Sequence, residues 1–398
     1  MSIKHHMRSA AKSPAVAADF CPVIQSGDRA DRSKRNMYQI IDHPDKSQLT
    51  EYEAFICACH NGSFTQSAAW AQVKAGWGHY LLVSCRTDGA LRGAALVLHK
   101  KLPPPFGGIL YSPRGPVGDL SDEALVADFA EGARELAHRC HACFYRCDPW
   151  LAGNEPKVLT PWRQAGFRPG PQQGDYNTIQ PRTLYVLPLA GRDRAQILAD
   201  FHPKWRYNLR LAQRRGVVCA LCGEEALDEF YELMIETGRR DGFTIRPKAY
   251  FSALLRAFGP QCARLFICRH EGRALSGALC IRYGGKACYL YGASSSCERR
   301  CMPNHLMQWE MICWALDGGC TVYDFGAIPH WQQPQHPDYG IYRFKKGFGG
   351  QPCTFAGELD LVSRPAAYHL LMAGQRWDCF WRKMGRYLHQ HHHRRYRS

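Results

Sequence analysis

The sequence predicts an α/β (α+β) protein made of two successive domains, each a mixed sheet with helices on both faces. Amphipathic helical patterns alternate along the chain with strand-like apolar runs, as in proteins whose helices cover a sheet. One order of elements, helices followed by a three-strand antiparallel meander, a helix and a strand, occurs twice. The 398 residues, of which 45% are hydrophobic, are enough for two or three cores.

The first copy of this order begins after residues 1–36, whose polar, Ala/Ser/Lys/Arg-rich composition predicts a disordered basic N-terminus. Apolar residues then recur with helical spacing before three strand-like runs, of which the first is "HYLLVSCR". The expected elements are a strand at Tyr38–Ile41, helices at 47–59, 66–75 and 122–140, and strands at 79–86, 93–100, 107–117 and 143–148.

A Pro/Gly-rich stretch, residues 167–182, separates the two copies. The second copy is expected to contain strands at 183–189, 263–270, 274–283, 286–294 and 321–326, and helices at 192–200, 204–214, 224–240 and 303–317. The halves repeat an architecture rather than a sequence. A further strand, "TFAGELDLV", and a helix from Pro365 follow. We expect residues 37–182 plus 350–398 to form the first domain and residues 183–349 the second.

Basic residues exceed acidic ones, 51 Lys and Arg against 35 Asp and Glu, so the net charge is +16 at pH 7. This excess favours a polyanionic partner, such as nucleic acid, a phosphate ligand or an anionic membrane face, although basic tails carry part of it. The first residues hold no apolar block long enough for a signal peptide, and no stretch approaches the roughly 20 apolar residues of a spanning helix. We therefore expect a cytoplasmic protein.

Nineteen cysteines are scattered through apolar runs such as "LFICR" and "GALCI", where a free cysteine behaves as a small core residue. Two groups raise the alternative of a zinc site: Cys140, His141, Cys143 and Cys147 in "RCHACFYRC", and Cys219 and Cys222 in "CALC". A structural zinc site usually takes pairs separated by a short knuckle, whereas these groups lie far apart in the sequence. We expect no metal and no other cofactor.

The C-terminal residues show an amphipathic pattern. Apolar Trp377, Phe380, Trp381, Met384 and Leu388 fall on one helical face, opposite Arg376, Arg382, Lys383 and Arg386. Such a stripe could rest on the anionic inner face of the cytoplasmic membrane or pack on its own domain.

Nine segments, read together and in order, resemble the FemABX family of tRNA-dependent aminoacyltransferases, which build peptidoglycan cross-bridges. They are "FTQSAAWAQVK", "YSPRGPVGD", "CDPW", "RYNLRLAQRRGV", "ETGRRDGF", "LYGAS", "MPNHLMQWEMICWA", "YDFGAIP" and "YRFKKGFGG". The resemblance covers about residues 38–362. The chain lacks the long coiled-coil arm that some family members carry, and so resembles the compact subgroup. The chain departs from the family pattern at Ala327, where many relatives carry another glycine.

The resemblance implies two tandem GNAT-like acyltransferase domains separated by a cleft. It implies that a monomer transfers an amino acid from aminoacyl-tRNA to the stem-peptide side-chain amine of a peptidoglycan precursor, either a UDP-muropeptide or its lipid-linked form, and so makes an interpeptide bridge. An aminoacyl ester is already an activated donor, so the enzyme must align the amine and stabilise the oxyanion rather than supply a nucleophile. The amino acid transferred and the acceptor diamino acid stay open.

The segment "YRFKKGFGG" carries the predicted transfer site. The resemblance implies that Lys345 stabilises the oxyanion or the 3′-ribose, and that the backbone carbonyl of Phe344 steers the attacking amine. Lys346 is expected to be structural. Without the resemblance, both lysines would be interpreted as exposed charges in a Gly-rich segment.

The resemblance also implies a site for the precursor's diphosphate at Lys74, which shares a helical face with Trp70 at i−4. Arg240 is its expected partner, because a guanidinium suits bidentate phosphate contacts, and Arg239 competes for this assignment. Each of these side chains alone would be interpreted as a surface charge.

Three further residues are assigned to the precursor's peptide. Tyr111 and Asp119 flank "SPRGPVG", the loop expected to cradle the muropeptide; Asp119 would accept a proton, pair with the incoming ammonium or cap a turn. Tyr291 would bond the stem peptide or pack in the core. Asn304 follows Pro303 at a predicted helix start and is expected to serve that terminus.

The segment "KWRYNLRLAQRR" predicts a basic helix with Trp205 and Tyr207 among its cations. We expect it to bind the tRNA acceptor stem through phosphate contacts, or else to be a solvated face. Its basic residues are Lys204, Arg206, Arg210, Arg214 and Arg215.

Two other functions stay open. An acyl-CoA-dependent GNAT-type N-acyltransferase would cradle pyrophosphate on a Q/R-x-x-G-x-G/A loop, which neither "RRCMPN" nor "SPRGPVGD" fits. A non-catalytic tRNA- or membrane-binding protein would have no need of the residues around Lys345.

Overall fold

The computed structural model describes residues 37–151, 156–170 and 179–374. The predicted disordered N-terminus and the predicted amphipathic stripe of residues 376–388 lie outside these ranges. No helix in the described ranges is long and apolar enough to cross a membrane.

The first part of the chain forms an eight-stranded mixed sheet of order β1-β2-β3-β4-β6-β15-β7, with β5 paired to β3. Neighbours are antiparallel except β4 and β6, which run parallel. The strands are β1 (Tyr38–Ile41), β2 (Gly78–Cys85), β3 (Leu91–Lys101), β4 (Gly108–Ser112), β5 (Val117–Gly118), β6 (Ala142–Cys147), β7 (Arg168–Pro169) and β15 (Leu359–Val362).

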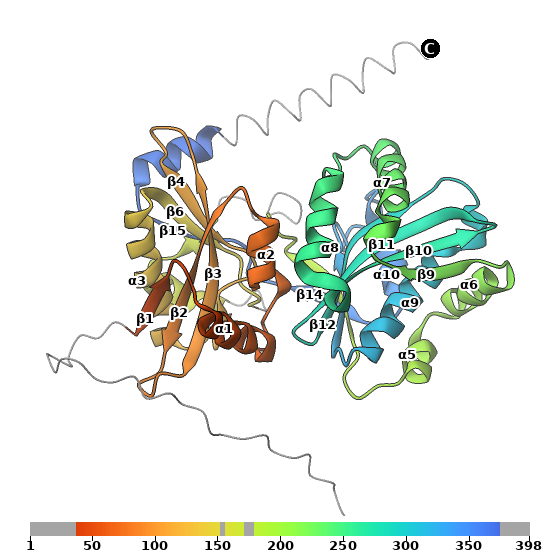
Figure 1. The fold of residues 1–398 in the computed structure, drawn as a ribbon, viewed down its shortest axis with the longest axis horizontal. Helices are drawn as coiled ribbons and strands as arrows, with labels where there is room; N and C mark the ends of the chain where they lie inside the picture. Colours follow the sequence, from red (N-terminus) through yellow and green to blue (C-terminus); the bar gives the residue numbers. More distant parts are fainter. Residues whose placement is uncertain (1–36, 152–155, 171–178, 375–398) are drawn as a thin grey trace, which may run out of the picture. The chain divides into compact units, whose positions relative to one another are not determined.

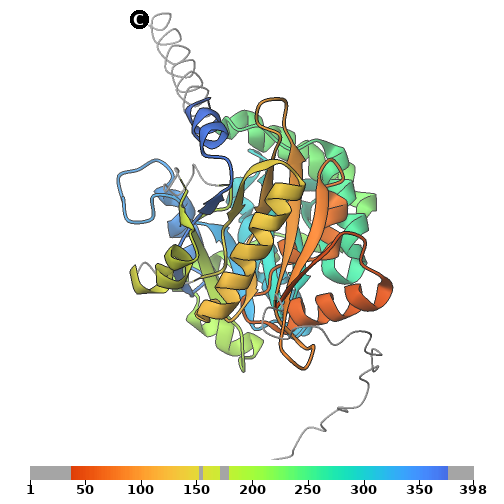
Figure 2. The ribbon, with the colours of Figure 1, turned by 90° about the vertical axis from the view of Figure 1, so that its left-hand side faces the viewer.

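Helices cover both faces of this sheet. They are α1 (Lys46–Ala58), α2 (Ala68–Val73), α3 (Glu123–Arg139) and α4 (Thr160–Gln164). Figure 2 shows α3 lying across the strands, and Leu82 and Val97 belong to the core that it covers. Leu81 and Leu96, their chain neighbours, point to the opposite face and pack with residues of α1 and α2, as the period-2 alternation of strand side chains requires.

The second part forms a seven-stranded sheet of order β14-β8-β13-β12-β11-β10-β9, in which only β12 and β13 pair in parallel. Its strands are β8 (Thr183–Pro188), β9 (Val218–Cys222), β10 (Ala263–His270), β11 (Arg273–Tyr283), β12 (Lys286–Ser294), β13 (Val322–Ala327) and β14 (Gln351–Thr354). Its helices are α5 (Arg194–Asp200), α6 (Pro203–Arg214), α7 (Leu227–Asp241), α8 (Lys248–Cys262), α9 (Pro303–Asp317) and α10 (Tyr339–Lys346).

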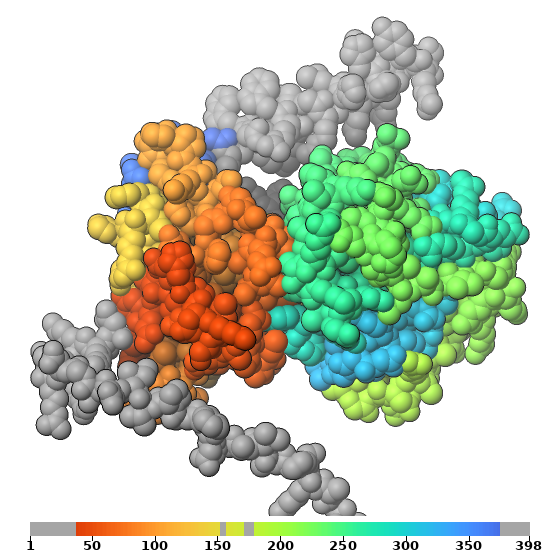
Figure 3. Space-filling view, viewed as in Figure 1, coloured from red at the N-terminus to blue at the C-terminus, as the bar shows by residue number. Residues whose placement is uncertain are grey.

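One core joins the two sheets. It contains Ile56 and Trp70 from α1 and α2 together with Phe230 and Phe251 from α7 and α8. Figure 1 shows α2 and α8 side by side, and in Figure 3 the orange surface of α2 adjoins the green surface of α8. The predicted fold class, two mixed sheets covered by helices, is confirmed.

The chain returns from the second sheet to the first after Thr354, because β14 pairs with β8 whereas β15 pairs with β6. Arg146 of β6 fixes this return through buried ion pairs with Glu358 (2.9 Å) and Asp360 (2.7 Å). The predicted domain limits stay a prediction. If each domain is defined by its sheet, the second domain would end at Thr354 rather than at residue 349, because β14 pairs with β8.

Candidate functional site

A cavity of about 680 Å³ opens where β12 and β13 separate. The two strands pair only over Lys286–Cys288 and Val322–Asp324. Beyond this point, residues of both strands line the cavity instead of bonding to each other, among them Tyr289, Gly292 and Phe325. The splayed strands thus make room for a ligand inside the sheet.

Helix α9 forms another wall of the cavity. One face of α9 contributes Asn304, Met307 and Gln308, whose spacing of three and four residues places them together. The Nε2 atom of Gln308 is buried and has no hydrogen-bond partner within the described ranges, while its Oε1 accepts from the Tyr323 hydroxyl at 2.8 Å. An unpaired amide donor is therefore held at the cavity wall. Asn304, expected only to serve the helix terminus, lines the cavity as well.

A β-bulge shapes the floor. The register of β13 against β8 shifts between Asp324 and Ala327, and Gly326 takes a φ of 77°, which glycine adopts without strain. The Gly326 N–H donates to Asp324 Oδ1 at 2.7 Å, and all three residues line the cavity. The bulge thus turns a carboxylate and a backbone carbonyl toward α10.

Lys345 lies at this floor. Its side chain is 7% exposed, and its Nζ donates to the carbonyl oxygen of Ala327 at 2.7 Å. Burial lowers the pKa of Lys345 to about 8, while the charge of Asp324 acts in the opposite direction. At neutral pH the ammonium therefore remains charged, with N–H bonds left for a ligand. Lys346 is exposed, and its Nζ lies 5.7 Å from the centre of the Tyr342 ring.

Two more buried cations line the cavity, and neither was singled out from the sequence. Arg114 donates from Nη2 to the Pro181 carbonyl at 2.6 Å, and Lys286 donates from Nζ to the Gly62 carbonyl at 2.7 Å. Both are only a few per cent exposed. Together with Lys345 they make the cavity a site for negative charge, developing or permanent.

The carbonyl of Phe344, whose steering of the amine remains a prediction, accepts two hydrogen bonds in this structure. It accepts from Trp205 Nε1 at 3.0 Å and from the Gly347 N–H at 3.3 Å. Both lone pairs are therefore used, and an amine would have to displace one donor. The Phe344 side chain does line the cavity, with its ring 5.4 Å from that of His305.

Lys74 and Arg240, the predicted diphosphate pair, have different contacts. Arg240 lines the cavity, donating to the Ser294 carbonyl at 2.6 Å and pairing with Asp241 at 2.9 Å. Lys74 instead lies over the rings of Trp70 (4.8 Å) and Tyr250 (5.5 Å).

The cation beside Lys74 is Arg246, whose guanidinium is also 5.5 Å from the Tyr250 ring. Burial, and secondarily the charge of Arg246, lowers the pKa of Lys74. Two cations beside one aromatic ring give this part of the surface a positive potential. Arg239, the competing assignment, is exposed and does not line the cavity.

Tyr111, Asp119 and Tyr291 do not line the cavity. Tyr111 is buried beneath the Arg114 loop and donates to Asp148 at 2.8 Å; the other oxygen of Asp148 accepts from the Arg114 N–H at 2.5 Å. Burial raises the pKa of Asp148 to about 6. Tyr111 thus supports a cavity residue from below.

Asp119 is exposed and caps a turn, accepting from the N–H and the hydroxyl of Ser121. Tyr291 packs against Phe251, with ring centres 5.0 Å apart, and its hydroxyl donates to Tyr250 at 3.3 Å. The geometry matches the turn-capping and core alternatives left open for these two residues.

The basic helix is α6. Lys204, Arg210 and Arg214 are exposed, and their spacing places them with Tyr207 on one face. Arg206 has a different environment, because it donates to the carbonyls of Ala199 and Phe201, both at 2.7 Å. Lys204, Arg210 and Arg214 therefore remain available to a ligand, whereas Arg215, the fifth basic residue of the segment, donates to the Arg300 carbonyl at 2.6 Å.

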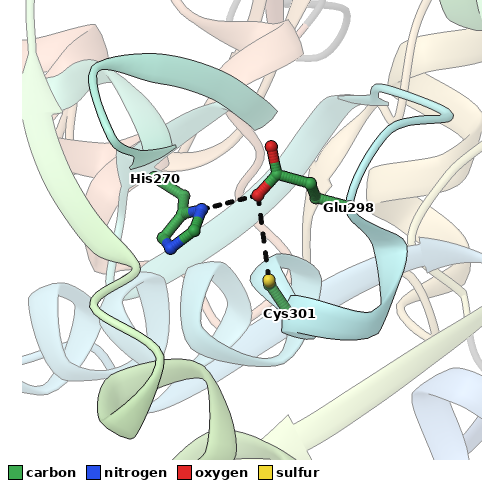
Figure 4. A group of neighbouring side chains, drawn as sticks. All are labelled: His270, Glu298 and Cys301. Atoms are coloured by element: carbon green, nitrogen blue, oxygen red, sulfur yellow. Dashed lines mark hydrogen bonds and ion pairs between the residues drawn. The ribbon is translucent and has the colours of Figure 1, made fainter.

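Within the described ranges, two groups of side chains place potential metal ligands close together, and neither contains the cysteines that were considered as an alternative zinc site. Those groups are His270, Glu298 and Cys301, and His330, His336 and Asp338. In the first group, Glu298 accepts hydrogen bonds from His270 Nδ1 (2.5 Å) and Cys301 Sγ (3.9 Å), as Figure 4 shows. Cys143 donates to the Gly108 carbonyl and Cys140 to the Tyr80 hydroxyl.

Comparisons with known proteins identify the family models and relatives that this chain matches. Residues 47–271 match the FemAB family model, and residues 200–346 match an acetyltransferase (GNAT) domain model. The lipid II:glycine glycyltransferase of Staphylococcus haemolyticus (strain JCSC1435) is 28% identical over 394 residues, and that of Staphylococcus aureus (strain MRSA252) 29% over 396; each alignment covers 81% of this chain and 93% of the relative. The crystal structure of FemX matches with a TM-score of 0.76 at 27% identity, over 83% of this chain and 99% of that one.

Proposed function

Because the chain belongs to the FemAB family, we propose that it transfers an amino acid from aminoacyl-tRNA to the stem-peptide side-chain amine of a peptidoglycan precursor, forming an interpeptide bridge. The glycyltransferases named above act on lipid II, which supports a peptidoglycan precursor as the acceptor here. The observation that carries the proposal is the buried Lys345 ammonium, held by Ala327 on the floor of a cavity between splayed strands.

In this proposal the ester carbonyl of the donor points its oxygen at Lys345. As the amine attacks, negative charge develops on that oxygen, and a fixed cation in a site shielded from water stabilises it by several kcal/mol. Arg114, which follows β4 of the first sheet, and Lys286, which begins β12 of the second, add positive potential. The protein supplies alignment and charge, which is sufficient because the ester is already activated.

Two surfaces beyond the cavity would hold the rest of the substrates. Lys74 and Arg246, rather than Lys74 and Arg240, would bind the precursor's diphosphate, since they flank the same tyrosine ring. The exposed face of α6 with Lys204, Arg210 and Arg214 would bind phosphates of the acceptor stem.

Muropeptide mass spectrometry of a strain lacking this chain tests the proposal. The wild-type strain should contain stem peptides that are heavier by the bridge residues, and the deletion strain should lack this increment until the gene is restored. Unchanged muropeptides would contradict the proposal. A thermal-shift titration addresses the acyl-CoA alternative, since stabilisation by CoA and none by UDP-muropeptide would favour it.

A further inference from the structure

Asp324 is a buried carboxylate that the transfer chemistry described so far does not use. It is 7% exposed and lines the cavity beside Lys345. Its Oδ1 accepts from the Gly326 N–H, whereas Oδ2 has no hydrogen-bond donor among the residues that the structure describes. This oxygen is not enclosed by protein atoms, so a ligand in the cavity can reach it.

Three cations act on the Asp324 carboxylate from outside ion-pair distance. Arg114, Lys286 and Lys345 act on it electrostatically, yet in the described part of the chain no ion pair within 4.0 Å involves Asp324. The other titratable groups that interact with it are Tyr323, Cys280, Cys288 and Cys353. Burial raises the pKa of Asp324, and the charges of Arg114, Lys345 and Lys286 act in the opposite direction.

The bulge of β13 places the Asp324 carboxylate near the carbonyl that holds the Lys345 ammonium. Within four residues it presents the Asp324 carboxylate, a hydrogen-bond acceptor, and the Ala327 carbonyl that holds the Lys345 ammonium, a donor. With the ester carbonyl at Lys345, the attacking amine would enter the same cavity, and Asp324 would lie there to receive it.

We propose that Asp324 is the subsite for the acceptor's primary amine and the base that takes its proton during transfer. This inference rests on the proposed function. When the neutral amine attacks the ester carbon, the new C–N bond leaves a positive nitrogen and an oxyanion at Lys345. Asp324 removes one proton from that nitrogen, the C–O bond to the ribose breaks, and the proton passes from Asp324 to the leaving 3′-oxygen. The products are an amide and a free hydroxyl, and the carboxylate is regenerated.

The test compares two acceptors in Asp324→Asn, which keeps the shape of the side chain but cannot take a proton. General-base catalysis is worth roughly 10²–10⁴-fold, so the saturated rate with the natural amine should fall by about that factor. An acceptor carrying an aminooxy group in place of the amine gives a more acidic adduct that loses its proton to water. With this acceptor the loss should shrink to less than about tenfold.

Controls separate this role from a structural one. Asp241→Asn removes another carboxylate of the cavity, one that is paired with Arg240, and should change both rates by the same factor. Equal losses with the two acceptors in Asp324→Asn, or no loss, would overturn the inference. So would relief of the defect by N-acetylated aminoacyl-tRNA, because Asp324 would then hold the donor's ammonium. A wild-type protein inactive with both acceptors would instead contradict the proposed function.

Discussion

The indole Nε1 of Trp205 donates a 3.0 Å hydrogen bond to the backbone carbonyl of Phe344. This bond ties α6, the basic helix, to α10, the helix that carries Lys345. The contact is close, since a Cβ added to Gly347 would lie 2.2 Å from the indole ring. A tRNA bound on α6 would therefore be connected to the lysine through a short rigid path.

Replacing Trp205 with Phe should loosen this connection. A phenyl ring replaces the indole and its N–H is lost, so we expect a stability loss of about 1 kcal/mol or more and a several-fold lower transfer rate with unchanged tRNA affinity. Gly347→Ala should have a similar effect, because its methyl group displaces the indole. Trp309→Phe, on a helix face that packs against Phe201, is the control and should leave the rate unchanged. Equal effects of the two Trp variants on the rate would show that the bond has no role.

The pKa of Lys345 predicts an unusual pH profile. A lysine-like acceptor amine has a pKa of about 10.4, so below this pH its neutral, reactive fraction rises about tenfold per pH unit. Lys345 loses its own proton above a pKa of about 8. The kcat/KM for the acceptor should rise up to pH 8 and then level off. A rise continuing to pH 10 would mean that the charge of Lys345 is not needed.

The same shift predicts a change in stability. The pKa of Lys345 is lowered from 10.5 in the unfolded chain to about 8, so between these values the unfolded state binds more protons and stability rises with pH. Lys345→Met lacks this contribution. Its melting temperature should equal or exceed that of the wild type at pH 7, and the wild type should gain on it above pH 8. A parallel pH dependence of the two proteins would place Lys345 in water.

Removing exposed cations from α6 should weaken tRNA binding in a salt-dependent manner. Arg210→Ala and Arg214→Ala should each reduce the slope of log affinity against log salt by roughly one, if each contacts one phosphate. Arg206→Ala is the matched control, because its guanidinium bonds the end of α5, and it should lower stability instead. Filter binding at several salt concentrations measures all three.

The diphosphate assignment predicts a difference between two arginines. Arg246→Met and Lys74→Met should raise the KM for a diphosphate-linked precursor at least tenfold and leave the KM for a bare stem peptide unchanged. Arg239→Met, an exposed residue on α7, should change neither. Discrimination between these acceptors by Arg240→Met and not by Arg246→Met would restore the pairing expected from the sequence.

Much of the fold follows from local patterns. The meanders, the helix of Glu123–Arg139 and the helix of Pro303–Asp317 have strong periodicity, and the structure contains them. The sequence prediction omitted α8, although Phe251, Leu254, Leu255 and Phe258 recur with helical spacing. It also omitted β9, whose cysteines drew attention to metal binding instead.

The site was less accessible to such reasoning. Lys345, Phe344 and Arg240 lie on the cavity and were found through the motifs that carry the family resemblance. Asp324 and Lys286 lie in strands whose sequence suggests buried core, and only the folded structure shows that both line the cavity. Lys74 and Arg246 are distant in sequence, so their meeting over Tyr250 is a tertiary contact that no local pattern reports.

Transfer by the purified protein, compared between Lys345→Met and Lys346→Met, tests the central claim most directly. Aminoacyl-tRNA and a UDP- or lipid-linked precursor are mixed with each protein, and the acceptor's mass is followed. We predict that the wild type and Lys346→Met add one aminoacyl residue, whereas Lys345→Met is slower by about 10²–10³-fold with unchanged tRNA affinity. Transfer by Lys345→Met at the wild-type rate would contradict the account.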